Sequence, residues 1–187
     1  MANCVLVPSK ITAMDVDAYN EKGVYTTADV NNGAPLTIGV TPTTDGRGEV
    51  FTVTPVASDT ATGVWLAYSP EVVTTASGTL NFKGIDVDPR DFTNIKGVPF
   101  DMFKPNAGVD MIQVTEGFFA TSKSPTTVTG ATVVELNASG AFEAKTTSTS
   151  GYTGIGFKIV KSAPITIASG ALGGEQVNAW VLMCTQN

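Results

Sequence analysis

Three aspartates, Asp86, Asp88 and Asp91, have the spacing in this chain that best fits binding of a hard cation. Calcium binds several carboxylate and carbonyl oxygens, so these residues are the candidate metal ligands. The segment lacks the central glycine and terminal glutamate of the common calcium loop, and aspartates in loops also bond to backbone N–H groups. We therefore predict that no metal or other cofactor is bound, with a cation at these three aspartates as the alternative.

Catalytic patterns are missing from the sequence. The chain has no histidine, the commonest general acid, general base and metal ligand. It contains no G-x-S-x-G nucleophile elbow and no P-loop. Carboxylates and lysines remain, but no spacing gathers them into a reactive group. The sequence predicts that the protein is not an enzyme.

The two cysteines, Cys4 and Cys184, lie near opposite ends of the chain. Their separation fits neither a metal-ligand spacing nor a redox motif. A reduced, buried thiol behaves as a small apolar residue, and this is our prediction for both. Because chain termini often lie close together, a disulfide formed after release from the cell stays open as the alternative.

Composition and charge exclude several classes of partner. The chain has 187 residues, of which 15% are charged and 42% are hydrophobic, and its net charge is −6. Binding to nucleic acid or to an anionic membrane needs clustered lysine and arginine, which are scattered here. No apolar run approaches the roughly 20 residues that cross a bilayer. With no secretory signal at Met1, we expect synthesis in the cytoplasm of the producing cell.

Short alternating segments separated by glycine turns predict an all-β fold with little helix. Pro35 to Val40 alternates apolar and polar residues as a strand does, and Asn31-Asn32-Gly33 before it is a tight-turn signal. We also predict a turn at 20–23 followed by a strand at Val24 to Val30. A helical period is absent over any helical length, so helix is limited to short turns such as 88–92.

A long polar stretch with three prolines divides the chain into two β units. We predict two small subdomains resembling barrels or sandwiches, at 1–83 and 107–187, joined by an extended strap at 84–106. The strap carries four large apolar side chains, which are candidates for partner contact: Phe92, Phe100, Met102 and Phe103. The alternative is that they cover the seam between the two units.

Four segments resemble a family of tailed-bacteriophage capsid decoration proteins, also called cement or auxiliary head proteins. The segments are Tyr25-x-x-Ala28-Asp29-Val30-x-Asn32-Gly33-Ala34-Pro35-Leu36-Thr37, Trp65-Leu66-x-x-Ser69-Pro70-Glu71-Val72, Asp91-Phe92-Thr93-Asn94-x-x-Gly97 and Gly108-x-Asp110-x-Ile112-x-Val114-Thr115. They are scattered over most of the chain, and none contains a catalytic signature.

The resemblance implies a virion structural protein that binds the outer surface of a phage capsid and reinforces contacts between major capsid protein subunits. The implied partner is the major capsid protein, and the implied location is the capsid surface. A tail or head-fibre component is the first alternative, and a cell-surface or carbohydrate-binding β module is the second. The apolar terminal segments Cys4 to Val7 and Val177 to Cys184 need covering. They either pair with each other or are covered by another copy, for example in a trimer.

Overall fold

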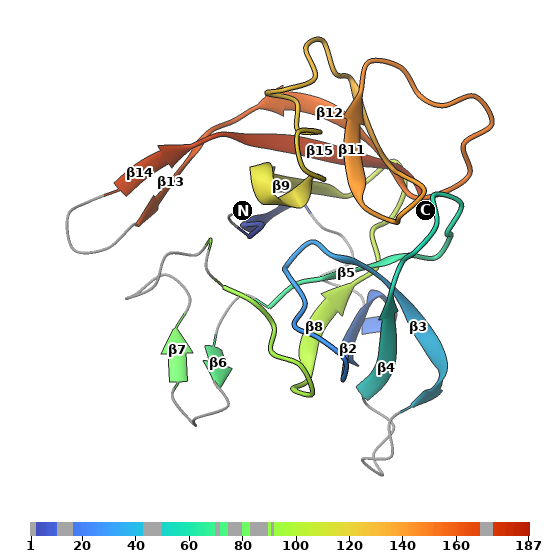
Figure 1. Ribbon diagram of the computed structural model, residues 1–187, viewed down its shortest axis with the longest axis vertical. Helices are drawn as coiled ribbons and strands as arrows, with labels where there is room; N and C mark the ends of the chain where they lie inside the picture. The colour runs from blue at the N-terminus through green and yellow to red at the C-terminus, as the bar shows by residue number, and fades with distance from the viewer. Residues whose placement is uncertain are drawn as a thin grey trace.

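A closed five-stranded barrel and a six-stranded antiparallel sheet form the body of the protein, at the bottom and the top of Figure 1 respectively. The structure is a computed structural model that describes residues 3–10, 17–42, 50–69, 72–74, 80–82, 90, 92–168 and 174–187. Named helical segments in these residues are short 3₁₀ turns, η2 (Asp17–Tyr19) and η4 (Glu116–Phe118). The all-β prediction is confirmed.

The barrel closes through a mixed set of strand pairs. Its strands are β2 (Asn20–Val24), β3 (Pro35–Pro42), β4 (Val50–Pro55), β5 (Trp65–Ala67) and β8 (Phe100–Phe103). Their order around the barrel is β2-β4-β3-β5-β8, and β2 closes it by pairing parallel to β4 and antiparallel to β8.

Two of the polar turns predicted from the sequence differ in outcome. The turn at Asn31 to Gly33 is present, with Gly33 at a φ of +79°.

The segment predicted as a turn at 20–23 is instead most of strand β2, and the strand predicted from Val24 to Val30 is wrong beyond Val24. Gly23 explains why a turn-like sequence fits a barrel strand. A Cβ atom there would lie 3.0 Å from Val53 Cγ1 and 3.1 Å from Met102 Sδ, so the glycine makes room for the barrel interior. The glycine in this segment is therefore explained by close packing inside the barrel and not by a turn.

The six-stranded sheet combines both ends of the chain. Its order is β1-β9-β15-β12-β10-β11. The strands are β1 (Leu6–Lys10), β9 (Met111–Thr115), β15 (Ala179–Gln186), β12 (Gly156–Ser162), β10 (Val133–Leu136) and β11 (Phe142–Lys145). Strand β9 lies between the terminal strands, with Val114 opposite Leu6 on one side and opposite Trp180 on the other. The prediction that the terminal segments pair with each other is therefore wrong: β1 and β15 each pair with β9, which separates them.

Two strands lie outside the units to which the sequence assigned them. Strand β1 was placed in the first unit but pairs with β9 of the second. Residues 100–103 were placed in the strap but form β8, because their alternation of buried and exposed side chains matches a barrel strand between β2 and β5. The connection between the units therefore ends before Phe100. Residues 84–89 and Asp91 of the predicted strap lie outside the described residues.

One hydrophobic core spans the barrel and the sheet. Leu66 and Phe103 of the barrel belong to the same buried cluster as Ile112, Phe157 and Leu182 of the sheet. Phenylalanine rings dominate the centre of this cluster, where Phe118 stacks on Phe142 with ring centroids 4.4 Å apart. A second, smaller cluster fills the barrel itself and includes Trp65 and Met102. Trp65 and Trp180 are both buried.

Backbone contacts also join the two parts. The Asn187 side chain accepts a hydrogen bond from Val64 N at 2.7 Å and donates to Val64 O at 2.9 Å and to Pro105 O at 3.0 Å. Gly140, in the turn between β10 and β11, lies so close to the chain after β4 that a Cβ atom would be 1.9 Å from Val56 O. The barrel and the sheet are therefore fitted to each other at the level of the backbone.

Two hairpins project from the body. One is formed by β6 (Val72–Thr74) and β7 (Leu80–Phe82), and the other by β13 (Ile165–Ala168) and β14 (Gly174–Val177). Each is a two-stranded sheet of its own, and both extend away from the barrel and the larger sheet in Figure 1. We call β13–β14 the arm. In the arm, β13 follows β12 and β14 leads into β15, so the arm extends this pair of strands beyond the six-stranded sheet.

Replacing Gly140 by alanine tests the fit between the barrel and the sheet. Gly140 and Gly130 have nearly equal positive φ angles, 76° and 75°, but a Cβ atom at Gly130 would meet nothing within 4 Å. We expect Gly130→Ala to cost about 1–2 kcal/mol of unfolding free energy through its backbone alone. Gly140→Ala should cost about 1–3 kcal/mol more because of the clash with Val56. Urea unfolding of both variants measures the difference, and equal losses would show that the two parts do not press together here.

Candidate functional site

The four apolar residues predicted to contact a partner lie in the interior. Phe100 and Met102 belong to the barrel core, Phe103 belongs to the core shared with the sheet, and Phe92 is buried as well. Their surface is used in filling the fold, so they form no contact surface on the folded chain. Of the two interpretations left open, covering the seam describes Phe103, whereas Phe100 and Met102 fill the barrel.

The three candidate metal ligands, Asp86, Asp88 and Asp91, lie outside the described residues. Within the part of the chain that the structure describes, no group of three or more acidic, cysteine or histidine side chains is placed to hold a metal ion. The same part contains no helix long and apolar enough to cross a membrane.

Three of the segments that carry the family resemblance meet in one buried polar network. The Asn94 side chain donates to Val30 O at 3.0 Å and to Asn32 Oδ1 at 3.1 Å. Asn32 Oδ1 also accepts from Ser69 N at 3.0 Å. The backbones of Val30 and Asn94 bond to each other in both directions at 2.8 Å. Asn32 and Asn94 are 1% and 4% exposed, so these amides are structural clamps and not exposed binding groups.

The fourth segment forms a turn that docks on β15. Asp110 is buried, and its carboxylate accepts a hydrogen bond from Asn106 N at 2.7 Å. Backbone bonds then join this turn to Cys184, from Gly108 N to Cys184 O and from Cys184 N to Asp110 O. Burial raises the pKa of the Cys184 thiol to about 12, so it stays protonated at neutral pH. Cys184 and Cys4 are both buried thiols, as the sequence predicted.

The Glu135 carboxylate on β10 is also buried, at 2% exposed. It accepts hydrogen bonds from the Ser148 hydroxyl, from Thr149 N and Oγ1, and from Lys145 Nζ at 3.2 Å. Burial opposes the ionised form, but these donors outweigh burial and lower the pKa of Glu135. The threonine- and serine-rich loop after β11 is therefore fastened to the sheet by the Glu135 carboxylate.

Three surface cavities adjoin one another in the described part of the chain. The arm cavity, of about 270 Å³, lies between β14 and the end of β9. The loop cavity, of about 230 Å³, is lined by residues 119–122 and Ser124, and the junction cavity, of about 210 Å³, by residues 31–35 and 140–142. Gly117 lines all three, so the cavities adjoin one another at η4. We call them the row of cavities.

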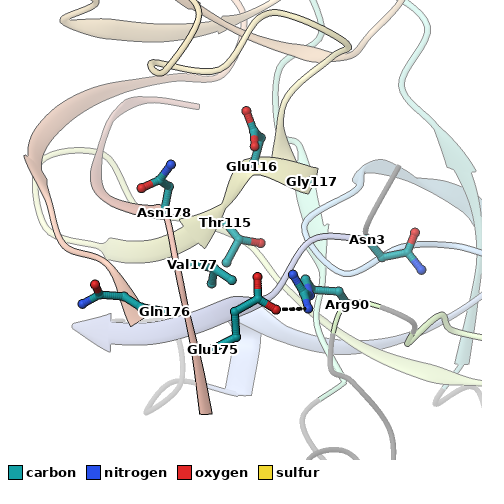
Figure 2. Close-up of a pocket in the computed structure, with 9 residues that line it drawn as sticks. All are labelled: Asn3, Arg90, Thr115, Glu116, Gly117, Glu175, Gln176, Val177 and Asn178. Atoms are coloured by element: carbon teal, nitrogen blue, oxygen red, sulfur yellow. Dashed lines mark hydrogen bonds and ion pairs between the residues drawn. The ribbon is translucent and has the colours of Figure 1, made fainter. Parts of the chain in front are cut away.

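Figure 2 shows the arm cavity. Arg90 Nη2 lies 2.7 Å from Glu175 Oε2, so an ion pair joins β14 to the chain leading into the barrel. The backbone of Arg90 is held in turn by Asn3 N, which donates to Arg90 O at 2.7 Å. Glu116 also lines this cavity and accepts a hydrogen bond from the Ser124 hydroxyl at 2.8 Å.

The row of cavities suits recognition better than catalysis. Its lining consists of amides, hydroxyls, carboxylates and small side chains, and its two carboxylates, Glu116 and Glu175, are bonded to Ser124 and Arg90. The described lining does pair one hydroxyl with one carboxylate, Ser124 with Glu116, but Ser124 is 2% exposed and so is shielded from a bound molecule. Sequence reasoning missed this row, because its described lining comes from six separate segments and none has a spacing pattern. The only local signal was Glu116-Gly117 directly after a strong strand.

Asn94→Asp tests the buried amide network. The substitution replaces the donor that binds Val30 O and Asn32 Oδ1 by an acceptor, so oxygen would face oxygen in a buried site. We expect a loss of about 1–3 kcal/mol in unfolding free energy. Asn31→Asp adds the same charge at an exposed neighbour and should change the stability little. Equal effects of the two variants in urea unfolding would mean that charge, and not the hydrogen bonds, is responsible.

Glu135→Gln tests the carboxylate that fastens the loop, with Glu143→Gln as a control that removes an equal charge from the same lysine. At pH 7 we expect Glu135→Gln to lose about 2 kcal/mol, the scale of hydrogen bonds to a charged group, and Glu143→Gln clearly less. Since the folded pKa of Glu135 lies below the ordinary 4.5, its stabilisation is complete above pH 4.5 and is lost as the pH falls through the folded value. Unfolding measured from pH 7 downward should show the gap between wild type and Glu135→Gln closing. A gap that is constant with pH would contradict the assignment.

Comparison of the chain with protein-family models, with curated proteins and with solved structures found no match. The function is therefore argued from the residues and their arrangement.

Proposed function

We propose that this chain is a structural protein of a tailed-phage virion, which binds the outer surface of the capsid and reinforces contacts between major capsid protein subunits. The observation that carries the proposal is the division of the fold into one body and two projecting hairpins (Figure 1). A body that keeps its shape and carries extensions can touch more than one neighbouring subunit. The protein would then stabilise the capsid through the surface area that it buries and not through a chemical reaction.

The body has the cohesion that such a role needs. Its buried cluster runs through both the barrel and the sheet, so a load applied to one part is resisted by the other. The polar groups of Asn32, Asn94 and Glu135 are engaged in internal hydrogen bonds. Buried networks of this kind favour a single arrangement over several. These features support a scaffold, and we propose that the protein is not an enzyme.

The residues behind the family resemblance support the same proposal through their positions. They build the turn at Asn32 and Gly33, the Asn94 clamp and the Asp110 turn, which set how the barrel meets the sheet. Residues of this kind preserve a shape, and shape is what a capsid-binding protein must present. The proposal extends to location: synthesis in the host cytoplasm followed by residence on the capsid.

The acidic charge fits a protein that docks on other protein. A net charge of −6 keeps the free chain soluble and disfavours binding to nucleic acid or to an anionic membrane. Isolated exposed valines, Val109 at 54% and Val160 at 47%, are ordinary surface residues and do not make a patch. We therefore look for the contact in the projecting parts and in the row of cavities.

Quantitative mass spectrometry of purified phage particles tests the proposal. We expect the chain in the head fraction at a copy number close to that of the major capsid protein. Tails separated from heads provide the control, because a tail or head-fibre component would be far scarcer than the capsid protein. Absence from particles, or a copy number of a few per virion, would contradict the proposal.

A further inference from the structure

The arm has a strand edge that the described residues leave uncovered. Strand β15 pairs with β9 as far as Ala179 opposite Thr115. Beyond that point β14 continues the line of β15, whereas the chain after β9 turns away into η4. In the described part of the chain β14 pairs with β13 alone. No described residue therefore pairs with β14 at the place that a continuation of β9 would fill.

The arm cavity occupies this place. Four consecutive residues, 175–178, line it together with residues 115–117. Side chains of a strand alternate between its two faces, so a cavity lined by consecutive residues runs along the edge of the strand. Figure 2 shows β14 on one side of this space and the end of β9 on the other. Asn3 and Arg90 close a third side.

We propose that the arm cavity is a slot for strand addition, in which an extended segment of another polypeptide pairs with the outer edge of β14. Main-chain hydrogen bonds to β14 would supply affinity, and alternate side chains of the segment would enter the cavity. Four residues of β14 give room for about 13 Å of extended chain. The inference rests on the proposed function, under which the segment belongs to the major capsid protein.

A loop covers one outer strand edge elsewhere in the described fold, and this edge serves as a comparison for β14. Strand β11 lies at the edge of the six-stranded sheet, and residues 120–123 cover it with backbone bonds between Ala120 N and Phe142 O and between Ala144 N and Lys123 O. No described segment covers β14 in this way. Natural sheets cover or blunt their edges unless the edge is used.

Charge narrows the choice of segment. The slot contains the carboxylates of Glu116 and Glu175 and the guanidinium of Arg90, which is paired with Glu175. A lysine or arginine of the incoming segment would lie next to the Glu116 carboxylate, which has no basic partner in the described lining. A second copy of the chain is disfavoured, because it would bring its own Glu175 and a net charge of −6. The occupant that we assign is an extended, basic segment of the capsid protein.

The test compares wild type with Asn178→Trp and Ser162→Trp on heads purified from a phage that lacks this gene. Asn178 and Ser162 are both exposed polar residues at the root of the arm, but only Asn178 lines the slot. We expect Asn178→Trp to fill the slot and weaken co-sedimentation with heads by about tenfold or more, a loss of roughly 1.4 kcal/mol. Ser162→Trp should bind like wild type. Circular dichroism and thermal unfolding establish that both variants are folded.

Hydrogen exchange of wild-type protein, free and bound to heads, gives a second readout that needs no variant. Slower exchange on binding at residues 174–178, with no change in β10, supports the slot. Binding without protection there, or full binding by Asn178→Trp, overturns the slot and leaves the proposed function standing. Failure of wild type to bind heads contradicts the proposed function and with it the occupant named here. A dimer in light scattering that Asn178→Trp dissolves would assign the slot to a second copy.

Discussion

The packing of the six-stranded sheet against the barrel is the contact on which the rest of the structure depends. Phe103 at the end of β8 and Phe142 on β11 are in one buried cluster, although they come from different sheets. The loops that connect the sheets have to fit this contact closely, as Gly140 against Val56 shows. Once the two parts are held in this way, η4 and Gly117 lie where the cavities meet, and the arm projects from a fixed base.

Buried polar groups then decide how exactly the loops are placed. The amides of Asn32 and Asn94 join segments that are far apart in sequence, and Glu135 holds the loop at Ser148 and Thr149. Each such group would be costly to bury without its partners, so these contacts restrict the fold to one arrangement. Because these polar groups are hydrogen-bonded inside the protein, they are not available for contacts at the surface. What remains at the surface for recognition is backbone edge, small polar side chains and a few charges.

Sequence patterns predicted the strands with clear alternation and missed those defined by their neighbours. Pro35 to Val40 was recognisable as a strand, and Gly33 as a residue with positive φ, because both signals are local. Strand β8 was not, since Pro99 and Pro105 flank it and suggested a connecting strap. Its buried Phe100 and Met102 only make sense once β2 and β5 stand on either side.

The same limit applies to the candidate site. Glu116, Arg90 and Glu175 lie far apart in the sequence. The pairing of β15 with β9 brings Glu116 near Glu175, and the backbone bond from Asn3 N to Arg90 O helps to hold Arg90 beside Glu175. Cys184 was predicted correctly as a buried thiol, because an apolar run around a cysteine is a local signal. The sites that sequence reasoning proposed for binding were apolar residues of the strap, and those were taken by the core. The recognition that we propose depends on a strand edge, and such an edge is a property of topology.

The central claim is that a body made of barrel and sheet sits on the outside of a capsid and reaches neighbouring subunits through its projections. Electron cryomicroscopy of the phage head that carries this chain tests it most directly. The account predicts density for the barrel and the six-stranded sheet as one unit on the outer capsid surface, with the arm touching an adjacent subunit. Heads with a bare outer surface, or density for this fold in the tail or inside the shell, would contradict it.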